Sequence, residues 1–135
     1  MLVLDTHVWI WLVIGDATLS ADARGAIEHA ARTGSVLVPA ISVWEVAMLE
    51  SRGRIVLAAP LVQWVRAALA APGLGLAPLE PEIAVESCRL PPPFHDDPAD
   101  RMIVATARVA GATLLTRDRR ILDYGGRGHV AVRRA

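Results

Sequence analysis

HDDPADRMIVATARVAGATLLTRD, residues His95–Asp118, contains the signals of one complete helix followed by one complete strand. Pro98 suits the first helical position because it lacks an N–H that would otherwise have no partner. Asp97 is then predicted to be the N-cap and Asp100 the third helical residue, in a variant of the capping box. Gly111 is predicted to end the helix. The stretch therefore predicts a well-defined helix with an acidic residue in its first turn.

The strand of this unit is predicted at Thr113–Thr116, a short β-prone run, and Asp118 lies just past its end. Other short apolar strands are expected at 2–4, 36–38, 74–79 and 129–132, and helices at 7–14, 21–32, 42–53, 61–71, around 81–90, and at 119–122. The strand at 74–79 is expected at a sheet edge because it contains Gly75 and Pro78. This alternation predicts a single α/β domain over residues 1–135 with a mainly parallel sheet.

Further local signals set the expected helix and strand ends. Thr6 and Ser20 are predicted helix caps, and Ser42 followed by Glu45 has the spacing of a capping box. Residues 125–128 are expected to form a glycine-rich loop, and residues 133–134 a frayed tail.

The composition sets limits on the class of protein. The 135 residues are 53% hydrophobic with a mean hydropathy of +0.39, which we attribute to a buried parallel sheet and a protein–protein interface. The formal net charge is zero, and all 14 basic residues are arginine, as GC-rich coding produces and as phosphate partners favour. The single Cys88 and the absence of a basic leader favour a reducing, cytoplasmic location.

Carboxylates recur where the predicted strands end. Asp5 ends the first strand, Glu45 lies early in the helix after the second, and Asp118 follows the strand at 113–116. Because ligands collect beyond the carboxyl ends of parallel strands, we expect these side chains and Asp100 to meet at one edge of the sheet. Clustered carboxylates need a cation, and oxygen ligands without cysteine or an obvious histidine partner favour Mg²⁺ or Mn²⁺.

Each acid also has a structural interpretation. Asp5 and Asp97 could cap helices, and Glu45 could be the capping-box partner of Ser42. Asp100 could complement a helix dipole, and Asp118 could belong to an exposed charge cluster with its arginine neighbours. The combination is more specific than any single member.

Three blocks in order, LDTHVWIWL (residues 4–12), ISVWEVAML (41–49) and DPADRMIVATARVAGATLLTRD (97–118), resemble PIN domain ribonucleases of the VapC toxin type. The resemblance covers essentially the whole chain. It implies a PIN-like three-layer α/β/α sandwich with a mainly parallel central sheet, and RNA hydrolysis with Mg²⁺ or Mn²⁺ at an acidic cluster. The matching positions are Asp5, Glu45, Asp100 and Asp118, with Asp5 and Asp100 as the firmest metal ligands.

The resemblance also implies supporting residues and partners. Thr116 would orient a carboxylate or water, Asp97 would support the acidic cluster, and His7 would contact substrate or fill a structural role, which we favour. A homodimer and a VapB-like antitoxin lying in an apolar groove are implied as well. The candidates for lining this groove are Trp9, Trp11, Trp44 and Met48. At least half of these side chains are expected to lie in the hydrophobic core instead. Arginines to test for phosphate contact are Arg52, Arg54, Arg101, Arg117, Arg119 and Arg120, with Arg101, Arg117 and Arg119 as the selected RNA-binding candidates.

The sequence is also compatible with two other functions. A metal-dependent phosphatase or phospho-accepting receiver domain also uses Asp at strand ends, but a receiver would require a Lys near its last strand and this chain has none. The second alternative is a catalytically inactive interaction module on the same scaffold, and the presence of all four matched acids argues against it. The sequence has no P-loop or GxGxxG motif for a nucleotide cofactor.

Overall fold

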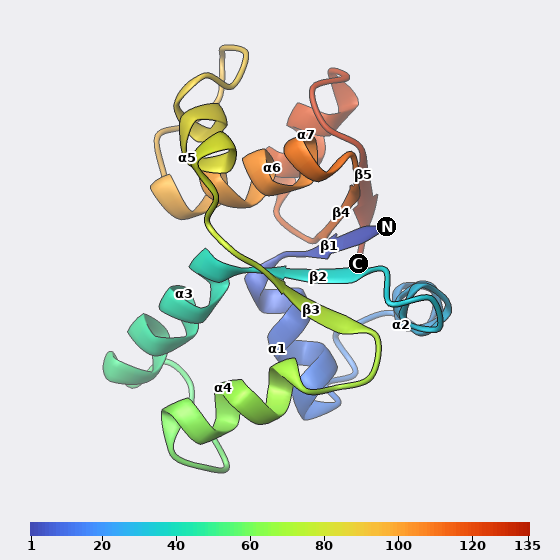
Figure 1. The fold of residues 1–135 in the computed structure, drawn as a ribbon, viewed down its shortest axis with the longest axis vertical. Helices are drawn as coiled ribbons and strands as arrows, with labels where there is room; N and C mark the ends of the chain where they lie inside the picture. The colour runs from blue at the N-terminus through green and yellow to red at the C-terminus, as the bar shows by residue number, and fades with distance from the viewer.

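The computed structural model describes residues 1–135 and contains one parallel five-stranded sheet with helices on both faces (Figure 1). The strand order is β3-β2-β1-β4-β5. The strands are β1 (Leu2–Leu4), β2 (Val36–Pro39), β3 (Leu74–Ala77), β4 (Thr113–Thr116) and β5 (Val132–Arg134). The helices are α1 (Thr6–Ile14), α2 (Ala21–Ala31), α3 (Ala40–Ser51), α4 (Leu61–Leu69), α5 (Pro81–Cys88), α6 (Pro98–Ala110) and α7 (Arg119–Gly126). The predicted α/β class with a parallel sheet is confirmed, and β3 lies at an edge as expected.

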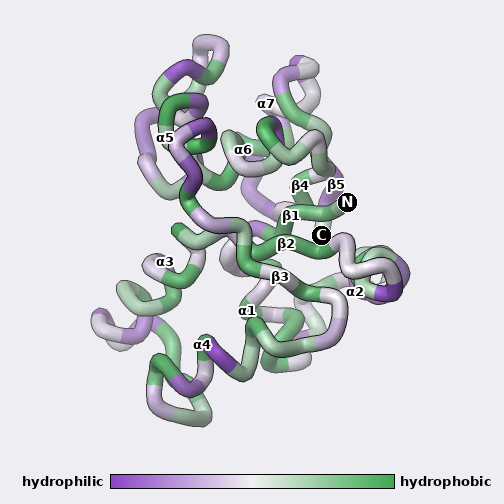
Figure 2. The backbone as a smooth tube through the Cα atoms, viewed as in Figure 1, coloured by the Kyte–Doolittle hydropathy of each residue, from purple (hydrophilic) through white to green (hydrophobic).

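Two hydrophobic cores lie on opposite faces of the sheet. Consecutive strand residues point to opposite faces, so Leu4 packs into the core beneath α1 to α4 and Val3 into the core beneath α6 and α7. Leu115 and Leu114 divide between the two cores in the same way. Figure 2 shows the hydrophobic residues concentrated along β1 and β2 in the middle of the molecule. The expected three-layer α/β/α sandwich is therefore confirmed.

Helix α6 forms as the local signals predict. The Asp97 side chain accepts a hydrogen bond from the Asp100 N–H at 3.2 Å, Pro98 occupies the first turn, and Gly111 ends the helix in the left-handed conformation at φ 61°. No helix of the protein is both long enough and apolar enough to cross a membrane.

Two predicted helix caps are wrong. Helix α1 begins at Thr6, because Asp5 already has extended backbone angles and its side chain accepts a hydrogen bond from the Thr6 N–H. Helix α3 begins at Ala40, directly after β2, so Ser42 lies inside the helix rather than at its cap. Both displaced residues, Thr6 and Ser42, have buried hydroxyls that face the functional site.

The C-terminal segment also differs from expectation. The last strand is 132–134 rather than 129–132, so the predicted frayed tail is wrong: Arg133 pairs with Leu115 of β4. Helix α7 continues to Gly126 instead of giving way to a loop at Gly125. A Cβ at Gly125 would overlap the side chain of Val132, so this glycine lets α7 pack closely against the last strand.

Candidate active site

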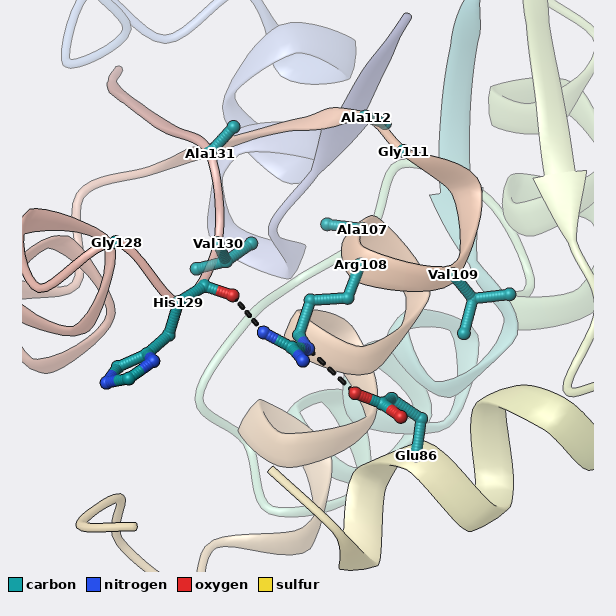
Figure 3. A pocket seen from close by; sticks show the side chains of 10 residues that line it. All are labelled: Glu86, Ala107, Arg108, Val109, Gly111, Ala112, Gly128, His129, Val130 and Ala131. Carbon is teal, nitrogen blue, oxygen red and sulfur yellow. Dashed lines mark hydrogen bonds and ion pairs between the residues drawn. The ribbon is translucent and has the colours of Figure 1, made fainter. Parts of the chain in front are cut away.

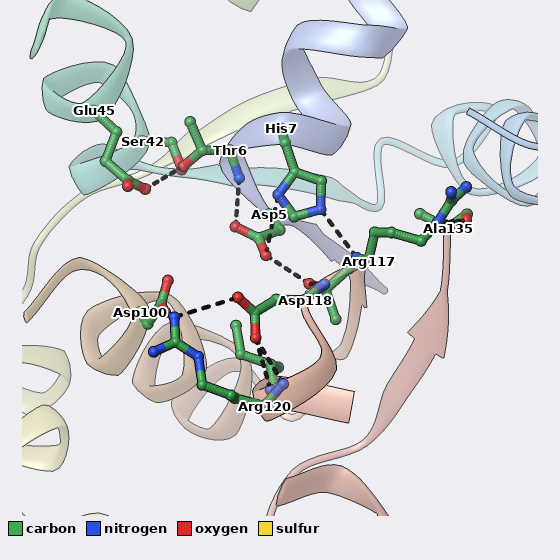
Figure 4. Close-up of polar contacts among 12 residues, drawn as sticks. Asp5, Thr6, His7, Ser42, Glu45, Asp100, Arg117, Asp118, Arg120 and Ala135 are labelled. Atoms are coloured by element: carbon green, nitrogen blue, oxygen red, sulfur yellow. Dashed lines mark hydrogen bonds and ion pairs between the residues drawn. The ribbon is translucent and has the colours of Figure 1, made fainter. Parts of the chain in front are cut away.

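Four carboxylates from distant parts of the chain face one another at the carboxyl edge of the sheet (Figure 4). Asp5 follows β1 and Asp118 follows the neighbouring strand β4, while Glu45 lies on α3 and Asp100 in the first turn of α6. Burial, followed by the negative charges of Asp5, Asp97, Asp118 and Glu45, raises the pKa of Asp100 to about 7. The expected meeting of the four acids at one edge is therefore what the structure has.

Asp5 is the most rigidly held of the four. It is only 4% exposed, and Oδ1 accepts a hydrogen bond from the Thr6 N–H at 2.7 Å. Its Oδ2 accepts a hydrogen bond from the fully buried Thr116 hydroxyl at 2.6 Å. The Thr116 hydroxyl in turn accepts from the N–H of Asp118 at 3.0 Å, so one threonine fixes the relative positions of two acids.

Glu45 is held through hydroxyl groups from α1 and its own helix. Its Oε1 lies 2.5 Å from the hydroxyl of Thr6, which also lies 2.9 Å from the hydroxyl of Ser42. Burial is the main cause that raises the pKa of Glu45, with Asp5 and Asp97 adding to it and the Thr6 hydrogen bond opposing it. The contacts of Thr6 and Ser42 with Glu45 and with each other were not predicted, because both residues were expected to cap helices.

Asp100 has two further neighbours that the sequence did not identify. Its Oδ2 lies 3.1 Å from Nε2 of His95 and 3.5 Å from Nη2 of Arg120. Nδ1 of His95 accepts a hydrogen bond from the N–H of Asp97, which leaves the imidazole proton on Nε2; this buried atom makes no hydrogen bond, although Oδ2 of Asp100 lies 3.1 Å away. Burial first, then Arg120, lowers the pKa of His95, which favours this neutral form.

Asp118 serves as both N-cap and cluster member. Its Oδ1 accepts hydrogen bonds from the N–H groups of Arg120 and Ile121 in the first turn of α7. Its Oδ2 lies 3.6 Å from Nη2 of Arg120. Arg120 therefore bridges Asp118 and Asp100 across the mouth of the cluster.

His7 has a structural contact beside Asp5. Its Nε2 accepts a hydrogen bond from the N–H of Arg117 at 3.0 Å, which leaves the proton on Nδ1, 3.6 Å from Oδ2 of Asp5. The histidine thus links α1 to the end of β4 next to the acidic cluster. The structural role favoured for His7 stays a prediction.

The selected RNA-binding arginines differ in their surroundings. Arg101 donates to the carbonyl oxygens of Ser87 and His95, and Arg117 to those of Thr18 and Ala135. These two guanidinium groups are partly buried and each donates to at least two carbonyl oxygens, which argues against a main role in phosphate contact. Arg119 is exposed at the start of α7.

The side chains predicted to line the antitoxin groove lie partly in the core and partly on the surface. Trp9 is fully buried and packs edge-to-face on Trp64, so it is not available to a partner. Trp11 is partly buried beneath the guanidinium of Arg117. Trp44 is 55% exposed and, with Met48 and Glu45, lines a hollow of about 510 Å³ beside the acidic cluster.

The donor set suits a hard divalent cation. Four carboxylates, one of them with a pKa near 7, repel one another in a way that a cation would relieve, and carboxylate oxygens are ligands that Mg²⁺ and Mn²⁺ prefer. No three of these side chains stand in a ready coordination geometry. The fit therefore rests on donor chemistry and electrostatics.

A separate hollow of about 490 Å³ lies at the other end of α6 (Figure 3). Arg108 crosses it, pairing with Glu86 at 2.7 Å and donating to the carbonyl oxygen of His129. The positive charge of Arg108 in this hollow is therefore paired with the negative charge of Glu86, whereas the acidic cluster has more carboxylates than cations.

Comparisons with known proteins agree with this architecture. A family model described as PIN domain matches residues 2–127. Ribonuclease VapC22 from Mycobacterium tuberculosis is 39% identical over 121 residues, covering 90% of this chain and 89% of that protein. 

Two solved structures share the fold at low sequence identity. VapBC2 from Rickettsia felis, bound to a DNA fragment from its promoter, superposes with a TM-score of 0.70 at 12% identity over 98% of this chain and 97% of that one. FitAcB from Neisseria gonorrhoeae gives 0.64 at 20% identity over 98% and 96%. The chain therefore belongs to the PIN domain family and is similar within it to the VapC toxins.

Proposed function

We propose that this protein is an Mg²⁺- or Mn²⁺-dependent endoribonuclease toxin that hydrolyses RNA phosphodiester bonds and is neutralised by a VapB-like antitoxin. The observation that carries the proposal is the convergence of Asp5, Glu45, Asp100 and Asp118, with the pKa of Asp100 raised to about 7. The relative at 39% identity is named a ribonuclease, which supports RNA as the substrate.

In this proposal Asp5 and Asp100 hold the metal most directly, and Glu45 and Asp118 complete the site. A divalent cation bound there supplies Lewis acidity and neutralises charge on the phosphate. Asp5 is held in one orientation by Thr116 and Thr6, so little reorganisation is needed when substrate binds. Glu45, whose pKa is raised by burial, would orient the attacking water and take a proton from it.

RNA phosphates would approach along the arginine-bearing start of α7. Arg119 and Arg120 are both exposed there, and Arg120 already lies against the carboxylates of Asp100 and Asp118. Guanidinium groups suit phosphate oxygens because they donate in a planar fork. Incoming phosphate would compete with Asp100 for Arg120.

The antitoxin is proposed to cover the hollow that Trp44 and Met48 line. This apolar surface adjoins Glu45, so a segment seated in it would also block access to the acidic cluster. The similar structure from Rickettsia felis is a VapBC complex, which supports a partner of this kind. We further propose a homodimer, a single domain over residues 1–135 and a cytoplasmic location.

The test is cleavage of single-stranded RNA by the purified protein. We expect cleavage in Mg²⁺ or Mn²⁺, loss in EDTA, and recovery when excess metal is restored. Asp5→Ala and Asp100→Ala should abolish cleavage while keeping the circular dichroism spectrum of the folded protein. Undiminished cleavage in EDTA, or by both variants, would overturn the mechanism.

A further inference from the structure

A second hollow adjoins the acidic cluster and shares no lining residue with the hollow beside Trp44. It has a volume of about 440 Å³ and lies between the loop that precedes α6 and the helix α7. Its lining residues are Pro93, Phe94, His95, Arg120, Asp123 and Arg127. His95 and Arg120 both lie against Oδ2 of Asp100, so the hollow opens directly beside the cluster.

Two aromatic rings, Phe94 and His95, line this hollow, and the buried ring of Tyr124 packs against Phe94. The ring centre of Phe94 lies 4.4 Å from that of His95 and 4.5 Å from that of Tyr124, with tilted planes. The buried Tyr124 donates to the carbonyl oxygen of Pro91 at 2.8 Å, which fastens the loop to α7. Arg101 holds the same loop through the carbonyl oxygens of Phe94 and His95. The wall is therefore held in place from both sides.

The rim of the hollow carries two exposed cations. Arg127 lies with its guanidinium 5.3 Å from the ring centre of Tyr124 and donates to the carbonyl oxygen of Pro93 at 3.1 Å. Arg120 stands between the hollow and the cluster, with its side chain 60% exposed. Asp123 also lines the hollow, so its own lining carries two arginines and one carboxylate, which suits one phosphate accompanied by a neutral hydrogen-bonding group.

We propose that this hollow binds the nucleotide next to the scissile phosphate of a single-stranded RNA. Arg127, together with Arg120, contacts its phosphate, and the base lies against the Phe94 and His95 rings. Asp123 accepts a hydrogen bond from the ribose hydroxyl or from a base N–H. The proposal rests on the proposed ribonuclease function and adds a site that determines which base is accepted beside the cut.

The first test is equilibrium binding of a labelled single-stranded oligoribonucleotide to the full chain, carrying Asp5→Asn so that the RNA survives. Arg127→Ala should weaken binding roughly tenfold and lower the slope of log K against log salt by about one, as expected for one lost phosphate contact. Arg127→Lys should recover part of the loss. The control is Arg32→Ala, which removes an exposed arginine after α2, near the amino end of β2 and away from the cluster.

The second test follows the base preference of cleavage in the active protein. Phe94→Leu keeps an apolar side chain in the core but removes the aromatic face, and should relax the preference at one position next to the cut while leaving the other positions unchanged. Binding by Arg127→Ala equal to that of Arg32→Ala, or an unchanged cleavage preference in Phe94→Leu, would overturn the proposal.

The two proposals fail in different ways. If the wild-type protein cleaves RNA and Arg127→Ala binds as the control does, the hollow is not a nucleotide site and the ribonuclease function stands. If the wild-type protein neither binds nor cleaves RNA, the ribonuclease function itself is wrong. Thermal unfolding of each variant verifies that it is folded.

Discussion

Replacing Asp100 with asparagine should stabilise the metal-free protein at alkaline pH. The pKa of this carboxyl rises from 3.8 to about 7 in the folded state, chiefly through burial and then through neighbouring negative charges. A shift of about three units corresponds to about 4 kcal/mol at 1.36 kcal/mol per unit. Its side chain is 15% exposed, so solvent screening is limited. Because Asp100→Asn also loses contacts with Arg120 and the cluster can relax, we expect roughly 2 kcal/mol.

The sign of this effect depends on pH. Because the folded-state pKa is raised, the stability associated with Asp100 is fully present below about pH 4 and is lost as pH rises through about 7. Asparagine does not titrate, so the gain from Asp100→Asn should be small at pH 4 and largest at pH 8. At that pH the thermal midpoint should rise by roughly 6 °C.

The assay is urea and thermal unfolding in EDTA at pH 4 and pH 8. The matched control is Asp123→Asn, which removes an exposed carboxylate outside the cluster and should give no comparable pH-dependent gain. An equal gain at both pH values, or destabilisation by Asp100→Asn at pH 8, would refute the account of strain within the cluster.

Three further outcomes follow from the same contacts. Thr116→Val should lower the free energy of unfolding by about 1–3 kcal/mol and reduce RNA cleavage, because Oδ2 of Asp5 and the N–H of Asp118 lose the hydroxyl that they share. The control variant Val3→Ile shows whether any change in the core reduces RNA cleavage in the same way. Asp97→Ala should cost about 1 kcal/mol by removing the α6 N-cap, as urea unfolding would measure, and an unchanged stability would exclude that role. Trp44→Glu should abolish co-purification with the co-expressed antitoxin while RNA cleavage persists, and an intact complex would place the antitoxin elsewhere.

The sequence predicted the elements whose signals are local. Helix α6 is the clearest case, because Asp97, Pro98 and Gly111 each act within one turn of the helix end that they define. The strand order was not predictable from such signals, since it depends on how the helices cover the sheet. The predicted ends of helices and strands were wrong where distant chain segments pack together. Helix α7, for example, extends through Gly125, which packs against Val132.

The site was predictable to the extent that parallel topology brings strand ends together. That reasoning and the family resemblance placed Asp5 and Asp118 at one edge, whereas the approach of His95 and Arg120 to Asp100 depends on the path of the loop before α6. The course of a loop cannot be predicted from the hydrophobic periodicity of the sequence. The position of His95 five residues before Asp100 was the one available signal.

Titration of the metal-free protein with Mn²⁺ by calorimetry at pH 8 tests the central claim most directly, namely that four carboxylates from separate elements form one divalent-cation site. We predict saturable binding by the wild-type protein, its loss in Asp5→Asn and Asp100→Asn, and a lower apparent affinity at pH 5.5, where the metal must displace the proton from Asp100. Asp123→Asn should bind as the wild type does. Equal Mn²⁺ binding by the wild type and both cluster variants would contradict the account.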